Sequence, residues 1–405
     1  MKRVCFYGMA ITACAFLALG ATPCSAQEVE QEAYTELKQE LKIDSIPNNT
    51  LVDSVKPRRN IFQKIGDYFK QSNKEVEPGK FDVTFIGGPH YSAEKQFGIG
   101  VLAAGVYRPD YETPPSNISL FGDVATVGFY EIGVRGNHIR RHDTSRINYE
   151  FYFYSFPNYF WGVGYEQGKN NYNKTKYSEL KAQLLADWLW RVGPATFVGP
   201  AVDFSYISAT KRRSNIPWQG YAPTTFSYGI GAKVIFDTRD NLTAPNQGMY
   251  VHAGLKVYPG WLFNKYQFGN FEFTYSYYCG LWKGGVLAMR AHGVFSFGKN
   301  IPWGMLASFG GSYNMRGYYA GRFCDRNEAD VTFELRQHVW RRNGIAVWVG
   351  AGEVFPYFKS FRTKWILPSW GLGYRWEFKK NINIRLDLGF GRDSSNFIFS
   401  INEAF

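Results

Sequence analysis

From Phe81 to the end of the chain, apolar and polar residues alternate with a period of two, and this alternation constrains the fold more than any other feature. Within Trp370–Lys379 every second residue is aromatic or leucine, and the residues between are glycine or charged. Segments 248–258 and 382–390 repeat this pattern. Successive side chains of a β-strand point to opposite faces, so each segment predicts a strand with one apolar and one polar face.

The composition of the two faces favours a membrane barrel over a soluble sandwich. Trp, Tyr and Phe supply 18% of the residues, and 42 residues are glycine. Barrels in membranes carry an apolar outer band with aromatic girdles at the strand ends. After the N-terminus, no run approaches the ~18–20 apolar residues of a membrane-spanning helix. The expected fold class is all-β: a 16-stranded antiparallel transmembrane β-barrel preceded by a short helical and linker segment.

Sixteen alternating segments are predicted as strands. They span 81–91, 96–107, 118–126, 129–140, 147–156, 175–193, 195–211, 224–239, 248–261, 266–281, 284–298, 329–342, 344–355, 369–380, 382–392 and 397–405. The even number places both ends of the barrel on one side of the membrane.

The lengths of the connections sort by the parity of these segments. The long connections 157–174, 212–223, 299–328 and 356–368 all follow odd-numbered segments. Most even-numbered segments end in tight turns, and Asn343-Gly344 is a strong hairpin signal. Long loops outside and short periplasmic turns are typical of outer-membrane barrels. The connection 108–117 is the exception, since it is long on the periplasmic side.

Residues 1–26 have the features of a secretory signal peptide. Lys2 and Arg3 precede the apolar run Val4–Ala21, and Cys24-Ser25-Ala26 is a small-residue cleavage site. We therefore expect the mature chain to begin at Gln27 and to reside in a Gram-negative type outer membrane. The rival interpretation is a lipoprotein box at Ile11–Cys14.

Residues 27–80 differ in composition from the barrel region 81–405, and we expect them to be periplasmic. Asp44–Pro57 is typical of a linker, and Asn60–Asn73 has the apolar spacing of an amphipathic helix. Three interpretations stay open for this helix: it packs on the main domain, it lies on the membrane surface, or it plugs the barrel.

Charge and motif content exclude several function classes. The net charge of +12 becomes +10 when Lys2 and Arg3 leave with the signal peptide, which fits either anionic lipid contact or basic loops. Cys279 and Cys324 remain after cleavage, and spacing does not say whether they pair. The six histidines show no metal-ligand spacing, and no nucleophile or phosphate-loop motif is present. No enzyme activity, metal, cofactor or nucleic-acid partner is expected.

Two loop motifs and the C-terminal region resemble one family. Met315-Arg316-Gly317-Tyr318, within 299–328, resembles the (V/I)RG(F/Y) motif of the BamA/TamA superfamily, or bacterial surface antigens. Residues 236–241 with Pro245 resemble its DTRDN turn, whose matching residues are Asp237, Arg239, Asp240 and Gly248. Glu334-Leu335-Arg336 resembles its E-x-R strand motif, and the chain ends on Phe405, as outer-membrane barrels commonly do. The resemblance covers about 81–405.

The sequence departs from the family in two places. Residues 27–80 are shorter than one polypeptide-transport (POTRA) domain and lack its strand–helix–helix–strand pattern. In addition, the family's F-x-D-x-G strand corresponds to Trp348–Gly352, so Gly350 replaces the aspartate that meets the loop arginine. A buried arginine still requires a carboxylate. Glu334 is the better candidate because its alternation points it inward, and Glu353 is out of phase.

The resemblance implies a physical rather than a chemical mechanism. A barrel of this type assists insertion, assembly or translocation of other proteins, and an incoming strand pairs at a weak seam between the first and last strands. The partners implied are outer-membrane lipid, lipopolysaccharide, client outer-membrane proteins and other assembly proteins. An accessory barrel without insertase activity is the alternative, and a passive porin is the third interpretation.

Overall fold

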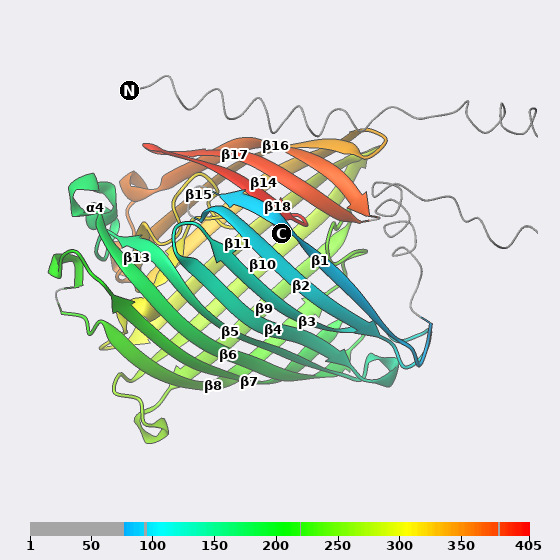
Figure 1. Ribbon diagram of the computed structural model, residues 1–405, viewed down its shortest axis with the longest axis horizontal. Helices are drawn as coiled ribbons and strands as arrows, with labels where there is room; N and C mark the ends of the chain where they lie inside the picture. Colours follow the sequence, from blue (N-terminus) through cyan, green and yellow to red (C-terminus); the bar gives the residue numbers. More distant parts are fainter. Residues whose placement is uncertain (1–76, 93–94, 219, 380) are drawn as a thin grey trace, which may run out of the picture. The chain divides into compact units, whose positions relative to one another are not determined.

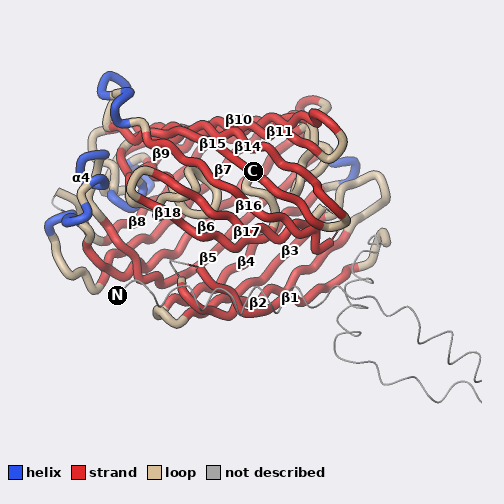
Figure 2. The backbone as a smooth tube through the Cα atoms, turned by 90° about the horizontal axis from the view of Figure 1, so that it is seen from above, coloured by secondary structure: helices blue, strands red, loops and turns tan. Residues whose placement is uncertain are grey.

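The computed structural model describes residues 77–92, 95–218, 220–379 and 381–405. The predicted signal peptide, linker and amphipathic helix lie outside these residues. Within the described residues, no helix has both the length and the apolar character needed to cross a membrane. Helical segments are short and confined to connections between strands (Figure 2).

Sixteen strands form one antiparallel sheet in which each strand pairs with the next one along that sheet. They are β1 (Phe81–Ser92), β2 (Gln96–Tyr107), β3 (Ser116–Ala125), β4 (Phe129–Ile139), β5 (Ser145–Phe160), β6 (Thr175–Gly193), β7 (Thr196–Thr210), β8 (Thr224–Asp237), β9 (Gly248–Tyr258), β10 (Phe268–Trp282), β11 (Gly285–Gly298), β14 (Asn327–Trp340), β15 (Asn343–Phe355), β16 (Leu367–Lys379), β17 (Ile382–Gly391) and β18 (Ser394–Ile401). The predicted all-β fold with sixteen antiparallel strands is therefore confirmed.

The connections hold the remaining elements. The loop between β11 and β14 contains a separate two-stranded sheet, β12 (Ala307–Phe309) with β13 (Phe323–Asp325). The α-helix α4 (Tyr165–Lys169) lies in the connection after β5. Single 3-10 turns occur at Arg141–Asp143, Asn171–Asn173, Ile216–Trp218, Gly260–Leu262, Trp303–Met305, Phe358–Ser360 and Thr363–Trp365.

The sheet curls until its first and last strands meet. Residues of β1 and β18 contact one another, and Figure 1 shows β18 in red beside β1 in blue. Among the described residues, no antiparallel ladder joins these two strands, although every other neighbouring pair in the sheet forms one. We call the contact between β1 and β18 the seam.

The two faces of the sheet are inverted relative to a soluble protein. On β16, Trp370 and Leu372 keep 52% and 53% of their surface exposed, whereas Arg375 keeps 5%. On β14, Phe333 is exposed, and its neighbours Thr332 and Glu334 are buried. Because large apolar groups are normally placed away from water, an exposed apolar outer face requires lipid around it. The loop between β11 and β14 lies against part of the polar inner face, where it contacts β14, β16 and β17.

Two details of the predicted strands are wrong. The tight turn after β14 consists of Arg341-Arg342, because Trp340 pairs with Asn343 after a bulge, and Asn343-Gly344 begins β15 instead. The last strand ends at Ile401 rather than at Phe405. Residues 402–405 turn toward the inner face, where Arg375 binds the Glu403 side chain and Arg336 binds the backbone oxygen of Phe405. Cys279 and Cys324 are free thiols.

Candidate functional site

The loop between β11 and β14 carries Arg316 to the inner face through a turn that only glycine fits. Met315 has φ +45° and Gly317 has φ +113°. A Cβ on Gly317 would lie 2.6 Å from the backbone carbonyl carbon of Phe390 on β17. The absence of a side chain at position 317 therefore lets the loop lie directly against β17, and this close approach buries Arg316.

The Arg316 guanidinium lies between two carboxylates from different strands. It forms an ion pair with Glu334 on β14, and its Nη1 lies 2.7 Å from Oδ2 of Asp387 on β17. Its Cζ atom lies 3.7 Å from the centre of the Trp348 ring. The Ser369 hydroxyl donates a hydrogen bond to the Arg316 carbonyl oxygen at 2.6 Å. Strands on both sides of the loop thus hold this one residue.

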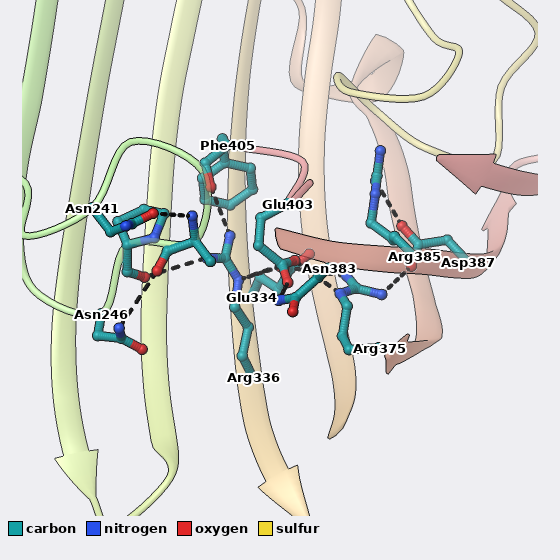
Figure 3. A network of polar contacts seen from close by, with 12 residues as sticks. Asn241, Asn246, Glu334, Arg336, Arg375, Asn383, Arg385, Asp387, Glu403 and Phe405 are labelled. Carbon is teal, nitrogen blue, oxygen red and sulfur yellow. Dashed lines mark hydrogen bonds and ion pairs between the residues drawn. The ribbon is translucent and has the colours of Figure 1, made fainter. Parts of the chain in front are cut away.

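Further arginines continue the network along the inner face (Figure 3). Arg336 Nε lies 2.7 Å from Glu334, and Arg375 Nη1 lies 2.6 Å from Asp387. Arg385 Nη1 lies 2.8 Å from Asp387, and Arg375 Nε lies 2.8 Å from Glu403. The cluster therefore joins four arginines, counting Arg316, to three carboxylates. We call these seven residues the arginine network: Arg316, Glu334, Arg336, Arg375, Arg385, Asp387 and Glu403.

The loop is also anchored beside Arg316 by the ring of Tyr318. Its hydroxyl donates to the Pro368 carbonyl at 2.7 Å and accepts from the Arg392 backbone N–H at 2.7 Å. Burial raises the pKa of the Tyr318 hydroxyl above its usual value, so the group stays a neutral donor. A Cβ on Gly391 would lie 2.3 Å from this ring, which explains the glycine opposite it.

Asp387 occupies the role that the sequence left open at Gly350. Gly350 pairs with Thr332 and Ser369, where an added Cβ would lie 2.9 Å from the Thr332 hydroxyl. Arg316 therefore forms ion pairs with Glu334 on β14 and with Asp387 on β17, a strand further along the sheet. Glu353 is elsewhere and accepts the Arg362 backbone N–H. Sequence reasoning missed Asp387, although its inward position in the alternation of 382–390 was a usable signal.

The DTRDN-like turn between β8 and β9 is built by its own side chains. Asp237 and Arg239 form a bidentate pair, with contacts of 2.9 and 2.7 Å. Burial would raise the pKa of Asp240, but the backbone N–H groups of Asn246 and Gln247 bind its carboxylate and lower that pKa. Gly248 has φ +101°, and a Cβ there would lie 2.3 Å from the Thr238 oxygen.

The C-terminal residues join this turn to the arginine network. Glu403 donates its backbone N–H to the Thr243 oxygen at 3.3 Å, and its side chain binds Arg375. The backbone oxygen of Phe405 accepts a 2.7 Å hydrogen bond from Arg336, as Figure 3 shows. Phe405 thus lies on the inner face, outside the last strand, and its ring also lies near Tyr278 and Arg336.

The sequence comparison with protein families decides where this chain belongs. The Omp85 superfamily domain matches residues 123–405, which is well over half of the chain. The chain belongs to the Omp85 superfamily. Omp85 barrels are non-enzymatic membrane proteins of the outer membrane, so the expected membrane setting and the absence of an enzyme role follow from the family. No curated protein matches the chain.

Solved structures that share the Omp85 fold with this chain include a BamA barrel and a CdiB barrel. BamA from Haemophilus ducreyi, lacking POTRA domains 1–3, is 11% identical with a TM-score of 0.55, and the match covers 79% of this chain and 70% of that one. CdiB from Escherichia coli is 9% identical with a TM-score of 0.52, and the match covers 80% of this chain and 63% of that one. At these identities the likeness extends to the fold alone.

Proposed function

We propose that this Omp85 barrel assists the insertion, assembly or translocation of other proteins at the outer membrane. The observation that carries the proposal is the seam: β1 and β18 are in contact without a hydrogen-bonded ladder among the described residues. A strand edge with unpaired N–H and C=O groups is a template for another strand. A client strand would add to this edge and use main-chain hydrogen bonds that do not depend on its sequence.

In this proposal, the loop that carries Arg316 holds the sheet in shape while the seam opens. If the seam opens, the rest of the sheet must keep its curvature. The arginine network joins β14, β16 and β17 to one another and to the loop. We infer that the loop braces this wall from inside, so that the opening is confined to the seam.

The first experiment measures client insertion. The purified protein is reconstituted into liposomes, and the folding rate of an unfolded outer-membrane protein is followed by its band shift. Cysteine pairs scanned along Phe81–Ser92 and Ser394–Ile401, with Cys279 and Cys324 replaced by serine, then close the seam by a disulfide. A disulfide between Ala103 and Leu120, which are partners in the β2–β3 register, is the matched control.

We expect a rate gain over empty liposomes that a seam disulfide abolishes and the control disulfide preserves. No gain from the intact protein would favour an accessory barrel without insertase activity. That outcome would call for co-purification with other assembly proteins.

A second experiment separates this function from that of a porin. The loop lies against the inner face of β14, β16 and β17, so the protein in a planar bilayer should show small, erratic conductance. Deleting Ser312–Asn327 should increase the conductance. Large and steady conductance from the intact protein would contradict the proposal and favour a passive pore.

A further inference from the structure

A second polar cluster lies on the inner face of β11 and β14, apart from the arginine network. His292 and Asp330 are direct partners in the β11–β14 register. Glu328 lies two residues before Asp330, so the strand alternation turns both to the same face. The Nδ1 atom of His292 is 2.6 Å from a Glu328 oxygen and 3.2 Å from an Asp330 oxygen. We call these three residues the histidine cluster.

The two carboxylates of the histidine cluster are buried and incompletely satisfied. The side chains of Glu328 and Asp330 have no exposed surface. Within the described part of the chain, no hydrogen bond reaches Oε2 of Glu328 or Oδ1 of Asp330. Arg290 is the cation beside them, and its Nη1 lies 3.8 Å from Asp330. Buried carboxylate oxygens without donors are costly, and a bound cation would satisfy them.

The donor set identifies the class of cation. We propose that His292, Glu328 and Asp330 bind one divalent transition-metal ion, for which Zn²⁺ is the fitting ion. One ligand atom from each of the three residues can be chosen so that all lie within 4.8 Å of one another, which is close enough for one ion to bind all three. Zinc binds imidazole nitrogen and carboxylate oxygen in tetrahedral sites. Calcium and magnesium prefer oxygen ligands alone, so the imidazole argues against them.

The surroundings of His292 fit a ligand role. Glu272 on β10 lies 3.9 Å from Nε2, on the opposite side of the ring from the two carboxylates. Ligating histidines commonly direct their second nitrogen at a carboxylate, which fixes the ring and leaves the first nitrogen free for the metal. A cavity of about 350 Å³ is bordered by Glu272 and Arg290, which are both neighbours of the cluster.

The site also touches the loop that carries Arg316. The side-chain nitrogen of Asn314 lies 3.4 Å from Nδ1 of His292, and Arg290 donates to the Asn314 oxygen at 2.7 Å. Bound metal would therefore order the wall at the place where the loop docks. Linear spacing hides the site, because Glu328 comes 36 positions after His292 and only the sheet register brings them together. The proposal does not depend on whether the barrel inserts clients.

The test is zinc binding to the full chain, stripped with a chelator and purified in detergent. Titration calorimetry compares the wild type with His292→Gln and Asp330→Asn. His338→Gln is the matched control, since His338 lies on β14 near the turn and outside the cluster. The band shift on heating verifies that each variant is folded.

We expect one Zn²⁺ per wild-type chain, at least tenfold weaker binding in His292→Gln and Asp330→Asn, and unchanged binding in His338→Gln. The X-ray absorption spectrum of the zinc should show imidazole and oxygen ligands. Wild-type binding no tighter than that of folded His292→Gln would overturn the proposal and leave a charged histidine paired with carboxylates. Sulfur ligands in the spectrum would also overturn it, since they would place the metal at a cysteine.

Discussion

The wall formed by β14–β17 and the region from β1 to β4 are held together in different ways. In the wall, Glu334 and Asp387 are fully buried and contact several arginines. In the β1–β4 region, Lys95 lies 3.0 Å from Asp123, and their side chains keep 31% and 16% of their surface exposed. The wall also holds the loop, whereas β1 meets β18 without a ladder among the described residues.

This difference teaches where the sheet is rigid and where it can open. Breaking a buried ion pair by removing one partner costs about 3–5 kcal/mol, whereas an exposed pair contributes about 0–1 kcal/mol. Ion pairs between side chains therefore stabilise the wall of β14–β17 more than the region from β1 to β4. The predictions below change one region at a time, from the largest expected effect to the smallest.

Replacing Glu334 by alanine should be the most damaging change. Three arginines, Arg316, Arg336 and Arg375, would then face one another with one carboxylate fewer. We expect a loss of at least the ~3–5 kcal/mol typical of one broken buried pair, measured as the free energy of unfolding in urea. Glu112→Ala is the control, because the Glu112 side chain is 81% exposed. Equal stability of the two variants would contradict the account.

Replacing Arg316 by alanine should cost about 3–5 kcal/mol, because Glu334 and Asp387 both lose a partner. The loop should also become accessible to protease. The double variant Arg316→Ala/Glu334→Ala should be less destabilised than the sum of the two single variants. Arg213→Ala, in an exposed connection, is the control. Strictly additive losses would mean that the two side chains do not interact.

The loop should be held more tightly in mild acid than at neutral pH. Burial raises the pKa of Asp325 to about 6, from an ordinary 3.8, despite the hydrogen bond from the Arg326 N–H. A raised carboxyl pKa means that folding favours the protonated form, so stability is lost as pH rises from about 4 through 6. The thermal midpoint should fall over this range, and Asp325→Asn should remove the change. A pH response that persists in Asp325→Asn would assign it to another group.

The smallest effect is expected in the region from β1 to β4. Asp123→Asn weakens the partly exposed pair with Lys95 and should cost less than about 1 kcal/mol. The unfolding midpoint in urea is the measurement, taken alongside Glu334→Ala. If Asp123→Asn cost as much as Glu334→Ala, the distinction between the two regions would be lost.

Much of the fold could be predicted because successive side chains of a β-strand point to opposite faces of the sheet. Apolar residues that alternate with polar ones in the sequence therefore gather on one face of the sheet. The period-two pattern of 370–379 located β16, and the outer apolar face of that strand requires lipid. The turn at Arg341-Arg342 was missed because a bulge before Trp340 shifts the register by one residue. Local turn propensity at Asn343-Gly344 was outweighed by the register of the strands.

The site was predictable only where its residues are near in sequence or share a motif. Glu334 follows the loop on the next strand, and its inward phase indicated a contact with Arg316. Asp387 and Glu403 reach the arginine network from β17 and from the tail after β18. Neither contact could be deduced without knowing how the sheet curls and where the loop docks. The meeting of His292 with Glu328 depends instead on the register of β11 with β14.

Hydrogen–deuterium exchange of the wild-type protein in a lipid nanodisc tests the central claim most directly, because it measures the seam and the braced wall in one sample. Backbone amides of β18 should exchange fastest among the strands, since its edge toward β1 lacks a ladder. Amides of β14 and β15 should exchange slowest, since the loop and the arginine network cover them. Equal protection of β18 and β14 would contradict the account.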